Sequence, residues 1–333
     1  MDLLLESLRE AGIARPYDLF YNYLKQWHWP ARLKMNKVFE VYAHKRREGN
    51  RKAKYFKCSA SEGLSVYAVV AHLIQKVFLP MDLPHLKPAL DAYIALSNLI
   101  DCLSLANRGC VTPDMLLQSA ERFLALFTAS WGFAYLCPKF HWLLHFGDHL
   151  EQFKTLIACF VHERKHKLIK RFANDMLNTR TLEVSVMHDC TDLQLASLCD
   201  PDSETCNFEV GLVNPRPAPQ KVRDFLCDEL GLDPDDVGDE IRVSNSSRFS
   251  ELGACHLRDV VLIKMSDDEY RAGGIPMTLV SVFDVRVMDQ ANGFAEWEDV
   301  NYILVVPTDD IVESLIWTKS GDYIRTLLPR NFC

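Results

Sequence analysis

The sequence of 333 residues lacks the usual signatures of membrane and secreted proteins. It has no run of about 18 uncharged apolar residues, the length that spans a bilayer, so we expect no membrane partner. The amino-terminal segment MDLLLESLREAG carries acidic residues within its apolar stretch and no cationic region before it, unlike a secretory signal. These absences favour an intracellular protein.

The eleven cysteines lack the spacing of a metal site or a disulfide framework. No pair stands at CxxC spacing, the number is odd, and several cysteines, such as Cys102 and Cys159, lie in apolar helical segments. The pattern predicts reduced thiols in a reducing compartment and no zinc ribbon. The acidic segment 228–240 lacks EF-hand spacing, which predicts a solvated loop and no calcium site. We therefore expect no cofactor.

The composition is that of a globular protein, with 48% hydrophobic and 25% charged residues. The net charge of −8 is unevenly distributed. Residues 1–190 contain 25 Lys and Arg against 18 Asp and Glu, whereas residues 191–333 contain 12 against 27. Such a split indicates two parts that face different partners, with the basic part as the candidate for a polyanion.

The hydrophobic pattern predicts an α+β protein in three parts. Residues 1–195 form an all-α region, residues 196–240 an acidic, proline-containing linker with a short helix at 219–230, and residues 241–333 a small domain. In the α region we expect helical segments at 17–44 with a break at Pro30, and at 64–79, 86–106, 112–130, 139–154 and 158–177. Thr112 is the expected N-cap of the fourth of these segments, and Pro113 its first residue.

From about residue 241 the apolar pattern changes to the alternation of strands. Segments such as MTLVSVFDVRVM and NYILVVP are rich in Val, Ile and Leu, and turn residues separate them. Five short strands over about 90 residues favour a small antiparallel β-barrel of SH3-like topology. Its aromatic residues are expected to fill the core in the main, although aromatic residues on small barrels sometimes form peptide-binding cages. Protein partners of this barrel are therefore one possibility.

Two groups of residues in segment 137–176 suggest site chemistry. His141, His145 and His149 recur every four residues, as zinc ligands on one helix face can, but HExxH is absent, and we expect packing or local hydrogen bonds. Glu163 stands among cations in HERKHKLIKR. It is either half of a surface pair with Lys167 or a metal-binding carboxylate at a phosphate site.

A second basic stretch, residues 32–57, favours nucleic acid. It holds ten Lys and Arg against two Glu, with Phe39, Tyr42, Tyr55 and Phe56 interleaved. Cations neutralise phosphates and aromatic rings stack on bases, although a solvated helix end or a nuclear-import signal has the same composition. The candidate nucleic-acid-binding residues of the chain are Lys45, Arg46, Arg47, Arg51, Lys52, Lys54, Arg164, Lys165 and Lys167.

The chain resembles the carboxy-terminal part of DDE transposases of the CACTA (En/Spm) type over about residues 55–180. The resemblance rests on the segment 56–74 and on three short sequence motifs. These motifs are Pro138-Lys139-Phe140-His141, Leu143-Leu144-His145 and Glu163-Arg164-Lys165-His166-Lys167. The resemblance implies an RNase H-like catalytic domain with two aspartates on strands and a glutamate on a late helix. Glu163 is the residue that matches this glutamate, and the helices of residues 60–135 match a helical insertion.

The two aspartates of such transposases have no counterpart here. Nothing strand-like precedes the matched insertion, and Asp18, Asp82, Asp91 and Asp101 lie in helical or loop contexts. Two-metal phosphoryl chemistry needs carboxylates from several elements. We therefore expect a transposon-derived, DNA-binding, nuclear protein in which Glu163 is vestigial. The alternatives are a Mg²⁺-dependent transposase or nuclease completed by a partner, and a protein-interaction scaffold whose acidic barrel is the reader.

Overall fold

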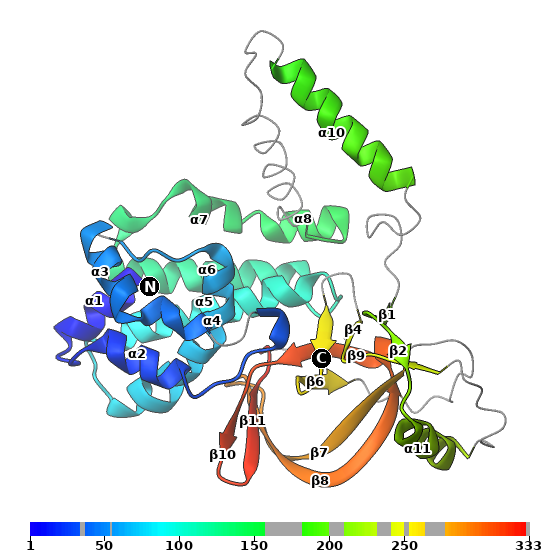
Figure 1. Cartoon of the computed structure of the whole chain (residues 1–333). Helices are drawn as coiled ribbons and strands as arrows, with labels where there is room; N and C mark the ends of the chain where they lie inside the picture. Colours follow the sequence, from blue (N-terminus) through cyan, green and yellow to red (C-terminus); the bar gives the residue numbers. More distant parts are fainter. Residues whose placement is uncertain are drawn as a thin grey trace.

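The computed structural model describes residues 1–33, 37–53, 55–156, 182–199, 210–231, 241–249, 253–263 and 277–330. Within these ranges, helices occupy the amino-terminal part and antiparallel strands the carboxy-terminal part, as Figure 1 shows. The chain is therefore an α+β protein with its helices before its sheets, which confirms the predicted fold class at this level.

The helical part is a cluster of amphipathic helices around a shared core. The ring of Phe20 contacts those of Tyr42 and Phe78 there, and each of these three side chains is fully buried. Burial of one such ring stabilises the fold by about 1.5–3 kcal/mol. The elements are α1 (Asp2–Glu10), α2 (Pro16–Leu24), η1 (Ala31–Leu33), η2 (Val38–Tyr42), α3 (His44–Ala53), α4 (Ala60–Leu73), the π-helical η3 (Ile74–Phe78), η4 (Leu79–Met81), α5 (Lys87–Ala106) and α6 (Pro113–Trp131).

Local capping residues set where two of these helices begin. Ser59 and Glu62 form a capping box, because the Glu62 amide donates to Ser59 Oγ (3.2 Å) while the Ser59 amide donates to Glu62 Oε2 (2.9 Å). Helix α4 consequently begins four residues before the apolar run at Leu64. Thr112 Oγ1 accepts a hydrogen bond from the Met115 amide, which confirms the predicted N-cap of α6.

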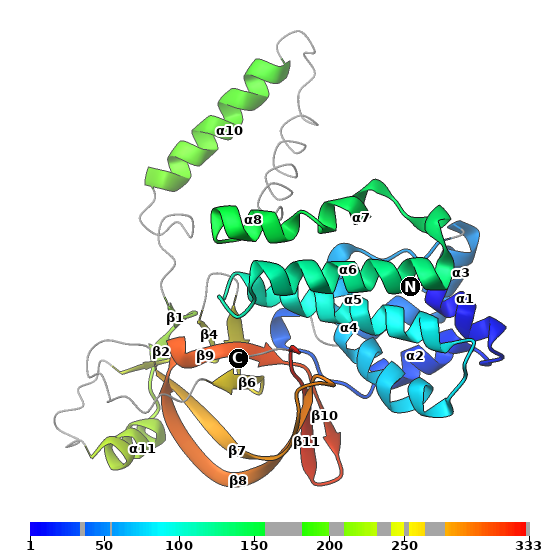
Figure 2. The same cartoon turned by 180° about the vertical axis from the view of Figure 1, so that it is seen from behind.

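Helices α7 (Pro138–Leu143) and α8 (Phe146–Phe153) divide the single helix expected over 139–154. The division arises because the Leu144 and His145 amides donate to carbonyls three residues back, on His141 and Trp142. Figure 2 shows α7 and α8 running along α6. Helix α10 (Leu182–Cys199) follows, and the helix expected at 158–177 lies outside the described residues.

The two most apolar helical segments are core elements of the fold. Residues 60–81 and 87–106 are long and apolar enough to cross a membrane by length and composition. Of the apolar window in each, 44% and 61% are buried against the rest of the chain. Leu73 and Ile74 in the first segment, and Leu99 and Leu105 in the second, are at most 1% exposed. The protein itself thus supplies the apolar surroundings of these side chains.

The carboxy-terminal part contains four antiparallel sheets among the described residues, in the strand orders β1-β4-β5, β10-β11-β8-β7, β2-β3 and β6-β9. Helix α11 (Gln220–Leu230) matches the short helix expected at 219–230. The strands are β1 (Gly211–Leu212), β2 (Arg216–Pro217), β3 (Arg242–Val243), β4 (Ser246–Arg248), β5 (Ala254–His256), β6 (Val260–Ile263), β7 (Met277–Asp289), β8 (Phe294–Pro307), β9 (Ile311–Leu315), β10 (Trp317–Ser320) and β11 (Tyr323–Leu327).

Strands β7 and β8 form a long, curved hairpin that dominates the sheet region (Figure 1). Its register runs from the Met277–Pro307 pair to the Asp289–Phe294 pair, with irregularities at two places that increase its bend. Gly293 closes the turn with φ +70, and a Cβ there would lie 2.9 Å from the Leu328 carbonyl oxygen. Only glycine therefore fits this turn.

The sheets are joined directly to the helices. His28 and Trp317 exchange two backbone hydrogen bonds of 2.7 and 3.0 Å, and their rings stack with centroids 4.4 Å apart. The Ala31 amide donates to Asp259 Oδ1 at 3.0 Å. Phe294 of β8 and Leu327 of β11 are buried in the same hydrophobic cluster as α2 and α4. The two parts consequently share one core, and the predicted boundaries at 195 and 240 stay a prediction.

A buried ion pair lies within this junction. Asp101 of α5 is 2% exposed and accepts hydrogen bonds from the backbone amide and Nη1 of Arg330, both at 3.1 Å. Tyr67 of α4 donates its hydroxyl to the other Asp101 oxygen at 2.7 Å. Burial raises the pKa of Asp101, although Arg330 and Tyr67 oppose the rise. The pair thus anchors the carboxy-terminal segment in the helical core.

Candidate nucleic-acid interface

Helix α3, with the sequence HKRREGNRKA, carries most of the described cations of the basic stretch 32–57. Its one buried residue is Asn50, whose Oδ1 accepts a hydrogen bond from the Lys57 amide at 2.9 Å. An isolated helix of ten such polar residues is marginal in water, so the contacts at its two ends and along its inner face hold it in place.

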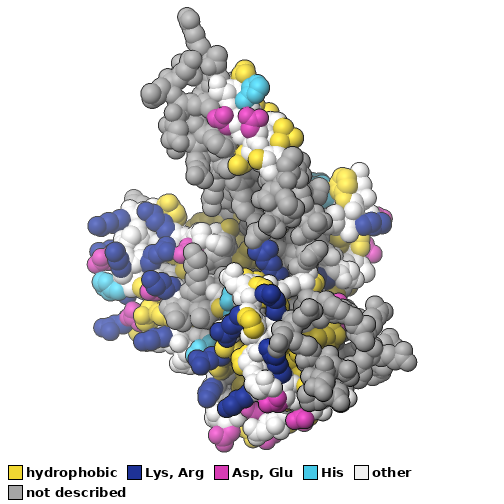
Figure 3. Space-filling view, turned by 45° about the vertical axis from the view of Figure 1, so that its right-hand side comes forward, with side chains coloured by type: hydrophobic (Ala, Val, Ile, Leu, Met, Phe, Trp, Pro, Cys, Tyr) yellow, Lys and Arg dark blue, Asp and Glu magenta, His cyan; other side chains and the backbone are white. Residues whose placement is uncertain are grey.

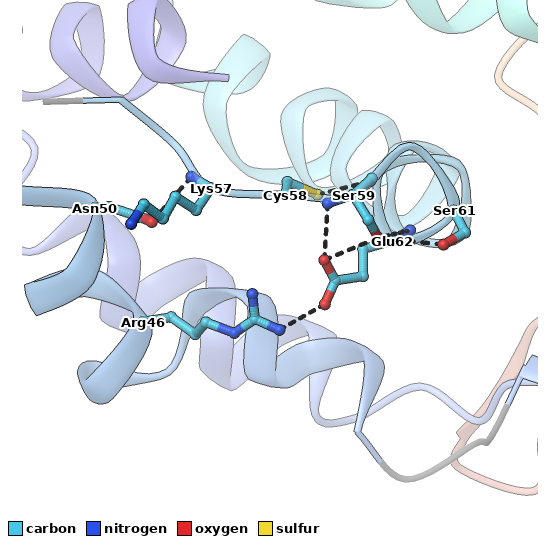
Figure 4. Close-up of polar contacts among 7 residues, drawn as sticks. All are labelled: Arg46, Asn50, Lys57, Cys58, Ser59, Ser61 and Glu62. Atoms are coloured by element: carbon cyan, nitrogen blue, oxygen red, sulfur yellow. Dashed lines mark hydrogen bonds and ion pairs between the residues drawn. The ribbon is translucent and has the colours of Figure 1, made fainter. Parts of the chain in front are cut away.

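Arg46 ties α3 to the start of α4. Its Nη2 donates to Glu62 Oε1 at 2.7 Å, and the other oxygen of Glu62 is engaged in the capping box with Ser59, as Figure 4 shows. Burial raises the pKa of Glu62, but the hydrogen bonds from Ser59 and the charge of Arg46 outweigh this effect, and the net pKa lies below the usual value. Glu62 is thus held ionised and satisfies a helix cap and a cation together.

Arg47, the next residue of α3, contacts α2 where Arg46 contacts α4. Its Nη1 lies 3.8 Å from Asp18 Oδ1 in α2, and its guanidinium lies 5.6 Å from the centre of the Tyr17 ring. Both interactions orient Arg47 towards the helical cluster. Arg46 and Arg47 keep exposed side-chain fractions of 45% and 37%, so phosphate contact by either residue stays a prediction.

Lys45, Arg51 and Lys52 form the outward surface of α3, which we call the α3 cation face. All three are exposed, and no carboxylate of the described residues pairs with them. Lys45 and Lys52 are seven residues apart, so they lie on one side of the helix two turns apart. In Figure 3, Lys and Arg side chains gather on the left, over the end of the helical part where α1 and α3 lie. This face also carries exposed Glu48, which lies 4.0 Å from His44, so its three cations present a net positive charge to solvent.

Most aromatic residues of the basic stretch belong to the core. Tyr42 is 1% exposed, Phe56 packs on Tyr42 with ring centroids 5.4 Å apart, and Phe39 packs on Tyr21 at 5.3 Å. Tyr42 is therefore inaccessible to a base, and Phe39 and Phe56 are partly buried against the same core. Tyr55 is the exception, since 57% of it is exposed and Lys57 Nζ lies 5.9 Å from the centre of its ring.

The other predicted site residues lie outside the described ranges. These residues are Lys54, Glu163, Arg164, Lys165 and Lys167. The aspartates considered for metal binding are described, and they lie where the sequence placed them, with Asp18 in α2, Asp82 in the loop after η4, and Asp91 and Asp101 in α5. Among the described residues, no group of three or more His, Cys, Asp or Glu side chains is arranged to hold a metal ion.

Sequence reasoning missed the acidic residues that hold the basic helix. Glu62 and Asp18 stand far from α3 in the chain and carry no nucleic-acid signature. The only available signal was Ser59-x-x-Glu62, the spacing of a capping box.

Cys58 precedes this capping box in the chain. Burial and the negative charge of Glu62 raise the pKa of the Cys58 thiol, so this thiol stays protonated and is a poor nucleophile.

Comparisons of the chain with protein-family models, with curated proteins and with solved structures found no match.

Proposed function

We propose that this chain is a transposon-derived DNA-binding protein whose α3 cation face contacts the phosphate backbone. The observation that carries the proposal is the group of three exposed cations, Lys45, Arg51 and Lys52, that lack a carboxylate partner among the described residues. The resemblance of residues 55–180 to CACTA-type transposases supports the same conclusion. Exposed Tyr55 at the end of this face offers a ring that stacks on an unpaired base.

The proposed contact is electrostatic and independent of base sequence. Each phosphate that a cation neutralises releases a counterion, so the logarithm of the affinity falls linearly with the logarithm of salt concentration. The slope is about −0.9 per contacted phosphate, and three contacts from the α3 cation face contribute about −2.7. Additional cations, including Arg46, Arg47 and Lys54, would steepen the slope further.

We expect the variant Lys45→Gln/Arg51→Gln/Lys52→Gln to bind a labelled generic duplex more weakly, with a salt slope reduced by about 2.7. The measurement is fluorescence anisotropy between 50 and 200 mM salt, about the range over which phosphate contacts weaken measurably. The matched control, Lys25→Gln/Lys139→Gln/Lys221→Gln, removes the same charge from exposed positions in other parts of the chain.

An equal loss of affinity in both variants would show that only net charge matters and would remove the assignment to α3. No binding by the wild-type chain at 50 mM salt would refute the proposed function as a whole. A single-stranded oligonucleotide of the same length tests Tyr55, because Tyr55→Ala should weaken binding to it more than binding to the duplex.

We propose that the chain alone does not cleave DNA. Glu163 is the one residue that matches a catalytic carboxylate of the resembled family, and a two-metal site needs carboxylates from several elements. Asp101, a carboxylate of the segment that matches the helical insertion, is neutralised by buried Arg330. The proposed location is nuclear, with KRREGNRKAK as the import signal.

A protein-interaction scaffold is the second candidate function, and the β7–β8 hairpin favours it. Eight large apolar side chains along the hairpin are exposed by 37–52%, namely Met277, Leu279, Val285, Val287, Met288, Val300, Tyr302 and Ile303. Exposed apolar surface of this kind marks interaction sites. This candidate gains if the duplex titration shows no binding, because the basic residues would then be solvated surface.

The finer prediction of a closed SH3-like barrel is retained as a proposal. The curvature of β7 and β8 in Figure 1 and the burial of Ala295, Val305 and Leu315 support it, since closure places alternate side chains inside. The acidity of the carboxy-terminal part argues for protein partners of this region over DNA.

A further inference from the structure

The paired histidines of the α7–α8 joint form the most defined side-chain cluster outside the basic stretch. His141 Nε2 and His145 Nε2 lie 3.1 Å apart, and the two rings are nearly perpendicular with centroids separated by 4.8 Å. Both side chains are exposed. With no ion between them, one ring donates its Nε2–H and the other accepts with its lone pair, which agrees with the local hydrogen bond expected from the sequence.

The backbone holds the two rings together. Between α7 and α8 the amides of Leu144 and His145 bond three residues back, and the His149 amide then bonds to the His145 carbonyl to start α8. This tight turn brings two side chains four residues apart to one point. The inner side of the joint is held against the core formed by α5 and α6. The side chains that pack there are Phe140, Leu143, Phe146 and Leu150.

Gly147 strengthens this fixation. A Cβ at this position would lie 3.0 Å from the Pro113 carbonyl oxygen and 3.4 Å from Leu117 Cβ, so α8 approaches α6 as closely as a glycine allows. The apolar side of the joint is therefore held in one position, so the backbone positions from which the two histidines project are preorganised. Preorganised ligands lose little conformational entropy when they bind an ion.

We propose that His141 and His145 bind one divalent late transition-metal ion, Cu²⁺, Ni²⁺ or Zn²⁺, through their Nε2 atoms. Two imidazole nitrogens about 2.0–2.1 Å from one ion lie about 2.9 Å apart at a right angle and about 3.4 Å apart at the tetrahedral angle. The observed 3.1 Å falls between these limits. Imidazole nitrogen suits these ions, whereas Mg²⁺ prefers oxygen ligands.

The second nitrogen of one ring also fits this role. His145 Nδ1 lies 3.7 Å from Asp148 Oδ2, beyond hydrogen-bond distance, so this carboxylate places a negative charge near the ring, which favours a bound cation. No third protein ligand of the described residues joins the pair. The remaining coordination positions then belong to water or to an external ligand, and the site is open.

Titration calorimetry of Ni²⁺ into the purified full chain tests this site. The variants His141→Ala and His145→Ala should each weaken the Ni²⁺ site by at least about tenfold, because each removes one of two protein ligands. The matched control is His149→Ala, which removes the next histidine of the series, one turn further along and packed against Phe153. Its Ni²⁺ affinity should equal that of the wild type.

A second control addresses other metal-binding residues of the chain. His162 and His166 have the same four-residue spacing, and the variant His162→Ala/His166→Ala should keep the Ni²⁺ site of the α7–α8 joint. Mg²⁺ in place of Ni²⁺ should give no heat of binding at this site. Wild-type Ni²⁺ affinity in both His141→Ala and His145→Ala, with unchanged far-UV circular dichroism, would overturn the proposal, as would an equal loss in His149→Ala.

Discussion

Replacing Asp101 by alanine is expected to lower the free energy of unfolding by about 3–5 kcal/mol. The substitution leaves the Arg330 guanidinium, whose side chain is 7% exposed, without its counter-charge, and it leaves the Tyr67 hydroxyl without its acceptor. Arg330 Nε already lacks a hydrogen-bond partner among the described residues, so the remaining structure offers little compensation. Urea denaturation at pH 7 measures the change.

A second ion pair between the same two parts of the protein provides the control. Arg108, two residues after the end of α5, pairs with Glu313 of β9, but both side chains are partly exposed. Arg108→Ala should therefore cost no more than about 1 kcal/mol. Arg330→Ala should cost about as much as Asp101→Ala. Equal, small losses in Asp101→Ala and Arg108→Ala would show that burial of the Asp101 pair has no energetic consequence.

Acidification is expected to destabilise the protein through His72. This residue is 1% exposed, its Nδ1 and the Tyr23 hydroxyl share a hydrogen bond of 2.6 Å, and its Nε2 has no partner among the described residues. Burial lowers the pKa of His72 to about 3, and the positive charges of Arg325, Lys76 and Arg330 add to the shift. The folded protein thus holds His72 in its neutral form.

The sign of the effect follows from proton binding. Below the usual histidine pKa of about 6.5 the unfolded chain binds a proton that the folded protein does not, so the free energy of unfolding decreases as the pH falls from about 6.5 towards 3. Between pH 6.5 and pH 4 this one residue should contribute a loss of about 3 kcal/mol. Above pH 7 its contribution should be constant.

Chemical denaturation at intervals between pH 4 and pH 8 measures this loss. Between pH 6.5 and pH 4, which we call the acid limb of the stability curve, the free energy of unfolding of His72→Phe should fall by about 3 kcal/mol less than that of the wild type. This difference should hold whatever the stability of the variant at pH 8. The exposed residue His85 supplies the comparison, because His85→Phe should leave the acid limb unchanged. Parallel acid limbs for the wild type and His72→Phe would contradict the neutral, buried state of this histidine.

Local sequence signals were sufficient for much of the helical part. The expected helices at 86–106 and 112–130 agree with α5 and α6 to within one residue, and Thr112-Pro113 is the local signal that sets where α6 begins. The prediction of one continuous helix over 139–154 was wrong, because this range contains the two helices α7 and α8. Its periodicity does continue across the break, but packing of Gly147 against Pro113 and a tight turn at Leu144 divide it.

For the candidate interface, the sequence located the positive charge but not its distribution over the surface. Arg46 and Lys45 are neighbours in the same basic run, yet one is paired with Glu62 and the other faces solvent. Likewise, the ring of Phe56 is in the core while that of Tyr55 is exposed. These differences depend on which side of α3 packs against α2 and α4. The local amino-acid sequence of α3 does not indicate which side that is.

The sequence by itself determined the α+β class, the order of helices before strands and the concentration of positive charge in the first half, because these depend on periodicity, capping and composition. Only the tertiary structure decided which charges are compensated, that Asp101 and Arg330 meet across 229 positions of the chain, and that His141 and His145 converge to 3.1 Å. Such contacts depend on how whole elements pack together. Packing is a property of the folded core, which no local segment specifies alone.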